Sequence, residues 1–169
     1  MNIVIGNIIS FFSALCMILS CCSKDMKKVF AYQFGECFLL AIASCFFGTF
    51  SAVITLLLCA IRNIIVAYNK FTMPLMIIFV ILVSLFGILV NNRGIIGLLP
   101  VIATIEYTIC CYFITDLKGT KISILVNLLI WVIYSFIILD FSTAILDSVI
   151  AIIDIIAIVK LLKHKKTGK

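Results

Sequence analysis

Phe50–Lys70, with the sequence FSAVITLLLCAIRNIIVAYNK, decides the fold because it occurs a second time as Phe141–Leu161, FSTAILDSVIAIIDIIAIVKL. The two stretches align without a gap at an offset of 91 residues (141 − 50 = 91). An apolar segment of about 20 residues is long enough to cross a bilayer. Each copy therefore predicts a transmembrane helix, and Asn63 in the first corresponds to Asp154 in the second.

The composition of the whole chain is that of an integral membrane protein. Of its 169 residues, 65% are hydrophobic, whereas soluble globular domains are about 45–50% apolar. The formal net charge is +6, but the lysines lie in short segments between apolar runs, which is typical of an orientation signal. We therefore expect the lipid bilayer as the surroundings and no nucleic acid as a partner.

Apolar runs separated by polar breaks predict seven transmembrane helices. The expected spans are Ile3–Cys22, Val29–Gly48, Phe50–Lys70, Leu75–Val90, Ile95–Thr115, Ile122–Leu139 and Phe141–Leu162. With seven spans, every lysine-bearing loop and the basic tail fall on one side, and the other side has only Arg93. The positive-inside rule then places the lysine side and the C-terminus in the cytoplasm and the N-terminus outside. Six spans would scramble this asymmetry.

The 91-residue offset extends beyond the two quoted stretches and defines a repeat of three helices. Further matching pairs are Gly6 and Gly97, Asp25 and Asp116, Lys27 and Lys118, and Ser44 and Ser135. A three-helix unit repeated directly would be inverted, and the fourth helix restores a parallel orientation. The expected all-α, 3+1+3 organisation is a first triple-helix repeat (1–70), a linker helix (71–93), a second triple-helix repeat (94–162) and a basic cytoplasmic tail (163–169).

This arrangement in so short a chain resembles the SWEET and PQ-loop transporter superfamily, and within it the YgjV family of small bacterial inner-membrane proteins. The resemblance is carried by Ser51-Ala52, Ala60-Ile61-Arg62-Asn63, Leu98-Leu99-Pro100-Val101-Ile102 with Thr104, and Trp131-Val132-Ile133-Tyr134. It implies two triple-helix bundles around a central solute path in the inner membrane, and it names no solute. SWEET-like chains carry helix-breaking prolines in both repeats, whereas Pro100 has no counterpart here and no Pro-Gln pair occurs.

Polar residues inside the predicted spans are the candidate site, because such groups are expensive to bury in a membrane. Glu36, Asn63, Asn127 and Asp154 lie at similar depths, about 10 Å from the lysine side at 1.5 Å per residue. They form two repeat pairs, Glu36 with Asn127 and Asn63 with Asp154. In SWEET-like proteins two asparagines on helices three and seven contact the solute, so the resemblance implies this role for Asn63 and Asp154. Trp131 shares a helix face with Asn127 and completes the expected solute-binding set.

Two further acids are candidates for proton coupling. Asp147 precedes Asp154 by two turns on one helix face, and Glu106 lies near mid-membrane without an acidic repeat partner. Four acids against one arginine leave an excess of negative charge inside the membrane. Such an excess favours a cationic or zwitterionic solute, or proton coupling, over an anionic solute.

A structural interpretation of the same residues stays open. Arg62 would then form an ion pair with Asp154 or Glu36, Asn127 would only bond between helices, and the aromatic pair on the sixth helix would be packing. The eight cysteines show neither zinc spacing nor a Cys-x-x-Cys pair and are interpreted as small apolar residues. No metal or cofactor is expected.

The leading functional hypothesis is a small-solute carrier that works by alternating access, with a small molecule as its partner. The alternative is a non-transporting membrane scaffold or a solute-binding subunit of a larger transport complex. An enzyme is disfavoured, because the predicted spans contain no histidine and no redox Cys-x-x-Cys pair. Whether the chain forms a homo-oligomer is left open.

Overall fold

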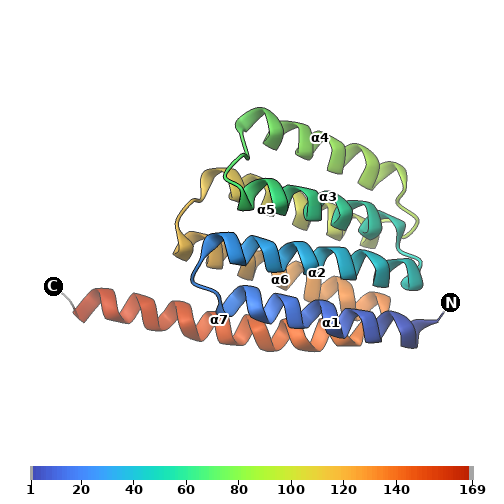
Figure 1. The fold of residues 1–169 in the computed structure, drawn as a ribbon. Helices are drawn as coiled ribbons and strands as arrows, with labels where there is room; N and C mark the ends of the chain where they lie inside the picture. The colour runs from blue at the N-terminus through green and yellow to red at the C-terminus, as the bar shows by residue number, and fades with distance from the viewer. Residues whose placement is uncertain (1, 168–169) are drawn as a thin grey trace.

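The computed structural model describes the backbone of residues 2–167 and, apart from Leu117 and Ala157, the side chains of residues 2–158. Over this part of the chain it contains seven α-helices, one short 3₁₀ helix and no strand (Figure 1). The elements are α1 (Ile3–Cys22), α2 (Met26–Phe47), α3 (Phe50–Ala67), α4 (Met73–Leu89), η1 (Ile96–Leu98), α5 (Leu99–Phe113), α6 (Leu117–Ile138) and α7 (Phe141–Thr167).

Length and apolarity of the helices agree with an integral membrane protein. Five segments are long and apolar enough to span a bilayer, namely α1, α2, α3, Ile96–Phe113 and Lys118–Ile138. The fourth helix is apolar but has 17 residues, which at 1.5 Å per residue is about 26 Å, slightly less than the hydrocarbon core. The remaining helix, α7, carries Asp147 and Asp154.

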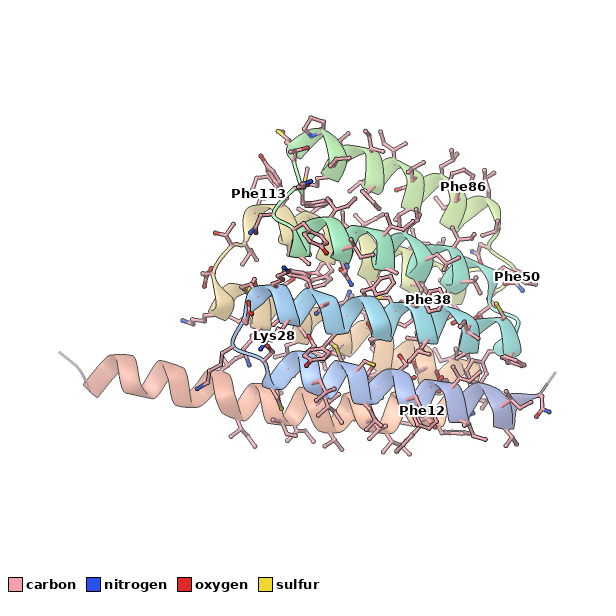
Figure 2. The ribbon with its side chains drawn as sticks, viewed as in Figure 1. Phe12, Lys28, Phe38, Phe50, Phe86 and Phe113 are labelled. Atoms are coloured by element: carbon pink, nitrogen blue, oxygen red, sulfur yellow. The ribbon has the colours of Figure 1, made fainter. Side chains whose placement is uncertain are left out.

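Large apolar side chains cover the outside of the bundle. Those labelled in Figure 2 and exposed in the structure are Phe12, Phe38, Phe50, Phe86 and Phe113. Contiguous apolar surface of this kind is rare on soluble monomers. In a bilayer the same side chains contact lipid and are not destabilising.

Two aspartates start α2 and α6 earlier than hydrophobicity predicts. The expected starts at Val29 and Ile122 are wrong, because Asp25 accepts a hydrogen bond from the Lys27 amide (3.0 Å) and Asp116 accepts one from the Gly119 amide (2.9 Å). An aspartate before the first helical residue satisfies amides that have no intrahelical partner. Each helix therefore extends into the polar loop at its start.

The two corners at the far ends of α2 and α6 have the same backbone structure. Gly48 and Leu139, 91 residues apart, both adopt left-handed φ angles, 65° and 67°. The following amides bond to equivalent carbonyls, Thr49 to Ser44 (3.1 Å) and Asp140 to Ser135 (2.9 Å). We call Phe47–Phe50 the α2–α3 corner and Ile138–Ser142 the α6–α7 corner.

Six helices form a closed ring and α4 lies outside it. Around the ring, α1 packs against α2, α2 against α3, α3 against α5, α5 against α6, α6 against α7, and α7 against α1. The fourth helix packs on α3 and α5. All helix axes run roughly along one direction, with odd-numbered helices opposite to even-numbered ones (Figure 1).

The bundle has two chemically different ends. The lysine end has loops and first helical turns that carry Lys24, Lys27, Lys28, Lys70, Lys118 and Lys121. The opposite, asparagine end has Asn7, Asn91 and Asn92 together with both corners. At this end the expected fifth helix is interrupted, since Ile96–Leu98 form the 3₁₀ turn η1. Pro100 then sits in the first turn of α5, where its missing amide hydrogen is not needed.

Candidate functional site

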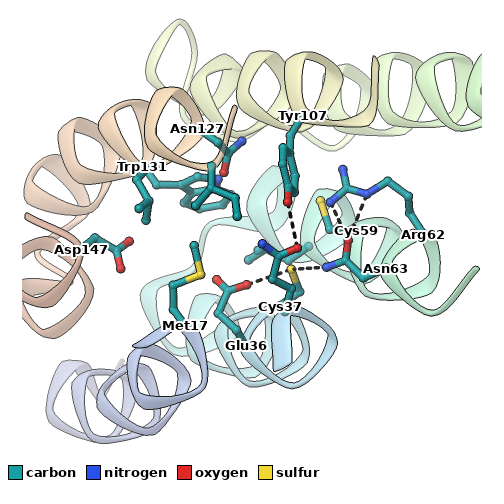
Figure 3. Close-up of a pocket in the computed structure, with 14 residues that line it drawn as sticks. Met17, Glu36, Cys37, Cys59, Arg62, Asn63, Tyr107, Asn127, Trp131 and Asp147 are labelled. Atoms are coloured by element: carbon teal, nitrogen blue, oxygen red, sulfur yellow. Dashed lines mark hydrogen bonds between the residues drawn. The ribbon is translucent and has the colours of Figure 1, made fainter. Parts of the chain in front are cut away.

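The ring of six helices encloses a cavity of about 30 Å³ (Figure 3). A space of this size holds about two water molecules and no larger solute. Every helix of the ring contributes to its lining, whereas α4 contributes no residue. The lining residues are Met17 from α1, Gln33, Glu36 and Cys37 from α2, Leu56, Cys59, Arg62 and Asn63 from α3, Tyr107 from α5, Ile124, Asn127, Leu128 and Trp131 from α6, and Asp147 from α7.

Residues at equivalent repeat positions face each other across this cavity. Four of the pairs separated by 91 residues have both members in the lining. The pairs are Gln33 and Ile124, Glu36 and Asn127, Cys37 and Leu128, and Leu56 and Asp147. The cavity thus lies where residues 91 positions apart in the chain come together.

Arg62 forms the cationic wall of the cavity and is held by neutral partners. Its Nε and Nη2 donate to Asn63 Oδ1 at 3.2 and 2.8 Å, and Nη1 donates to Thr108 Oγ1 at 2.8 Å. The guanidinium also lies over the Tyr107 ring, 4.8 Å from its centroid, a favourable position for a cation. Arg62 is 1% exposed, and these bonds fix its orientation.

Hydrogen bonds continue from Arg62 to a carboxylate on the neighbouring helix. Asn63 Nδ2 donates to Cys37 Sγ (3.6 Å), and the Cys37 thiol donates to Glu36 Oε2 (3.1 Å). Asparagine and cysteine therefore connect the buried cation of α3 with the acid of α2. This connected polar wall is drawn with dashed lines in Figure 3.

A second carboxylate reaches the cavity from α7. Asp147 is 6% exposed and lines the cavity, and among the described residues it accepts no hydrogen bond within the usual distance. An ionised carboxylate without a partner is unstable when buried. Asp147 is therefore the polar group of the site that a ligand, water or proton would satisfy.

Four of the five residues expected to contact a solute line this cavity. They are Asn63, Glu36, Asn127 and Trp131. Asn127 Nδ2 also donates to the Ala103 carbonyl (2.7 Å), so it additionally bonds α6 to α5.

The fifth expected contact, Asp154, is outside the lining. Its carboxylate lies near the lysine end, 3.7 Å from the Cys21 thiol that donates to it. Glu106 is also outside and accepts from the Cys110 thiol at 3.3 Å. Of the two acids expected to couple protons, the structure brings only Asp147 to the cavity.

Several lining residues were not singled out from the sequence. Gln33 accepts a hydrogen bond from the Tyr107 hydroxyl (3.0 Å), and Cys37 and Cys59 were interpreted as packing. Helical spacing is the signal that could have found three of them, because residues three and four positions apart share a helix face. Gln33 stands three residues before Glu36, Cys37 stands four residues after Gln33, and Cys59 stands four residues before Asn63.

Comparisons with known proteins identify a family and nothing more specific. The model of the Imp-YgjV family, described as a bacterial inner membrane protein, matches residues 4–165. A search of curated proteins and a search of solved structures found no match.

Proposed function

The chain belongs to the Imp-YgjV family of bacterial inner membrane proteins, and we propose that this multi-pass protein carries a small polar solute across the membrane by alternating access. The observation that carries the proposal is the enclosed polar cavity, to which all six ring helices contribute. Transporters built from internal repeats place their solute site at the interface between the repeats. A site of this kind needs polar groups that can bind a solute, and the Asp147 carboxylate lines the cavity.

We propose further that residues 1–70 and 94–162 are two parallel repeats with α4 as the linker. Three independent features support this arrangement. First, corresponding pairs of helices pack together in both units and at both seams of the ring. Second, the two corners share φ angles and hydrogen bonds. Third, four equivalent residue pairs line one cavity. Because each unit has three helices, the two units are parallel only if an odd number of helices connects them. The single helix α4 meets this condition, and it lies outside the ring as a linker would.

The charges around the cavity favour a cationic or zwitterionic solute. Glu36 and Asp147 supply carboxylates from α2 and α7, while the Arg62 guanidinium is held by Asn63 and Thr108. An anion would meet two carboxylates against the single positive charge of Arg62. Because the cavity is about 30 Å³, the solute enters only after the helices part, which makes the described conformation an occluded one.

A solute screen with matched variants tests this function. Thermal unfolding of the purified protein in detergent would be followed with candidate amines, amino acids and sugars at two pH values. A ligand that binds only the folded state raises the unfolding midpoint as its concentration rises. We expect the shift to disappear in Asn63→Ala and in Asp147→Asn, whose side chains line the cavity, and to persist in Asp154→Asn.

Uptake into proteoliposomes then separates the carrier from its alternative. Solute accumulation that is lost in Asn63→Ala supports transport. Binding without uptake indicates a solute-binding subunit, and a shift lost in Asp154→Asn but kept in Asn63→Ala moves the site to the lysine end. The absence of any shift, with variants as stable as the parent, refutes the proposal.

A further inference from the structure

Asn92 bridges the α2–α3 corner from the segment that leads into η1. Its Nδ2 donates to the Gly48 carbonyl at 2.7 Å, and its Oδ1 accepts from the Phe50 amide at 3.2 Å. Thr49 gives α3 no side-chain cap, so the Asn92 amide provides that cap from another part of the chain. A single side chain thus satisfies the carbonyl of Gly48, the residue that follows α2, and the first amide of α3.

Asn7 bridges the α6–α7 corner in the same way. Its Nδ2 donates to the Leu139 carbonyl at 3.2 Å, and its Oδ1 accepts from the Ser142 amide at 3.0 Å. Asn7 and Asn92 are not repeat equivalents, because residue 98, the position 91 beyond Asn7, is a leucine. The chain therefore builds similar bridges at both corners from two unrelated positions. The carbonyls are equivalent, and the amide of Ser142 is one position beyond the equivalent of Phe50 (50 + 91 = 141).

Two more contacts cross the same end of the bundle. The Ser10 hydroxyl donates to Asp140 Oδ2 at 2.8 Å, and Arg93 Nη2 donates to the Phe47 carbonyl at 2.8 Å. The contacts of Asn7 and Ser10 join the α6–α7 corner to α1, which begins the first unit. Those of Asn92 and Arg93 join the α2–α3 corner to the end of the linker segment, directly before residue 94. The first two must break if the units separate at the asparagine end, and the other two must break as well if the segment before η1 moves with α5.

The lysine end has a vestibule beside the ring. A vestibule of about 410 Å³ opens there between α2, α3 and α5, and Lys27, Asn69 and Tyr112 are among its lining residues. Phe30 lines the vestibule, and Tyr107 lines the central cavity. Both belong to one closely packed group of side chains, which therefore separates the two spaces. The barrier at the lysine end is thus made of side-chain packing. At the opposite end the corner residues Phe47 and Ile138 are also packed in an apolar core, and the hydrogen bonds at the two corners add to this packing.

We propose that Asn7 and Asn92 are the paired latch of the asparagine end. They hold the two corners against the opposite unit while the cavity is closed to that side, and they release both corners when it opens. The role of the latch rests on the proposed carrier function, but the experiment that tests it does not measure transport. A merely structural brace would stabilise the fold without controlling access to the cavity.

Access can be measured with thiols that the protein already has. Cys37 and Cys59 line the cavity and are each 6% exposed, and Cys22 is exposed at the lysine end. The full-length protein in sealed membrane vesicles would be treated with a membrane-impermeant maleimide. Mass spectrometry of peptides would give the alkylation rate of each cysteine. Rapid labelling of Cys22 identifies vesicles whose lysine end faces the reagent, and slow labelling identifies the opposite orientation.

The matched control is Asn91→Ala. Asn91 also makes two hydrogen bonds at this end, to the Gly94 carbonyl (2.7 Å) and from the Arg93 amide (2.9 Å), but both stay within one loop. In vesicles whose asparagine end faces the reagent, Asn7→Ala and Asn92→Ala should raise the Cys59 alkylation rate by roughly tenfold, since each removes two hydrogen bonds that hold the closed state. Asn91→Ala should leave the rate unchanged.

Three results would overturn the latch. The first is an unchanged Cys59 rate in both bridge variants, whether or not their unfolding midpoint falls. The second is an equal rise in Asn91→Ala, and the third is an equal rise in vesicles of both orientations, which would indicate general loosening. Faster labelling from the asparagine side in a protein that transports no solute would keep the latch and remove only the carrier function.

Discussion

Arg62 is the residue on which the polar wall of the cavity depends. Arg62→Met keeps most of the side-chain volume but leaves Asn63 Oδ1 and Thr108 Oγ1 without their donor. We expect the free energy of unfolding to fall by about 2–4 kcal/mol, since hydrogen bonds from a buried charge are strong and their buried partners lose hydration. Arg93→Met, which removes one bond of an exposed side chain, should cost less than about 1 kcal/mol. Equal losses in detergent unfolding would contradict this ranking.

Tyr107 has two separable contacts. Tyr107→Phe removes the hydrogen bond to Gln33 but keeps the ring beneath Arg62, so the unfolding free energy should fall by about 1 kcal/mol. Tyr107→Leu removes the ring as well and should lower it by about 1 kcal/mol more. Unfolding curves of both variants in the same detergent test this order. A Phe variant as unstable as the Leu variant would show that the ring contributes nothing.

Much of the cavity could be predicted from single residues, and the failures have a geometric cause. Polar groups at one depth gave Glu36, Asn63 and Asn127 correctly as neighbours. Asp154 was placed beside them because its repeat partner is Asn63, but the cavity meets α7 two turns earlier, at Asp147. Sequence equivalence fixes which residues correspond, whereas the tilt and packing of each helix decide which turn faces the centre.

At the scale of the helix, Leu139 is the clearest local conflict. A leucine with φ of 67° is in a conformation that costs a residue with a Cβ atom about 1–2 kcal/mol. Leu139→Gly should therefore raise the unfolding free energy by about 0.5–1 kcal/mol. Gly48→Leu, at the equivalent corner, should lower it by about 1–2 kcal/mol. Opposite shifts of the thermal midpoint are expected, and a fall in both variants would show that Leu139 packing outweighs its backbone strain.

Helix positions were predictable from hydrophobicity, but helix starts were not. The apolar runs locate all seven helices, yet α2 and α6 begin three and five residues before the expected starts. The energy of a helix start comes from a polar cap and not from apolar burial. In the sequence, Asp25 and Asp116 were recognised only as a repeated pair. They recur because both cap the start of a helix.

At the scale of the whole molecule, the 91-residue offset carried the most information. It indicates which helices correspond, and the corners at Gly48 and Leu139 have the same backbone conformation. The parallel 3+1+3 repeat itself stays a prediction. The offset could not predict how the ring closes, because the seams between α3 and α5 and between α7 and α1 depend on side chains without repeat partners. Asn7 and Asn92 are examples, and Lys121 of α6 adds a contact to α1 by donating to the Cys21 carbonyl at 2.8 Å.

Orientation in the membrane is the last property that the whole chain determines. Loops at the lysine end carry six lysines, and Arg93 is the basic residue of the loops at the asparagine end. Basic residues in short loops remain in the cytoplasm, so the lysine end should face inward.

A reporter that fluoresces only in the cytoplasm should be bright when fused to the C-terminus and dark when fused after Arg93. Alkaline phosphatase, which is active only outside, should show the reverse pattern. The same result from both fusion points would mean that an even number of spans separates them, in conflict with three spans from η1–α5 to α7.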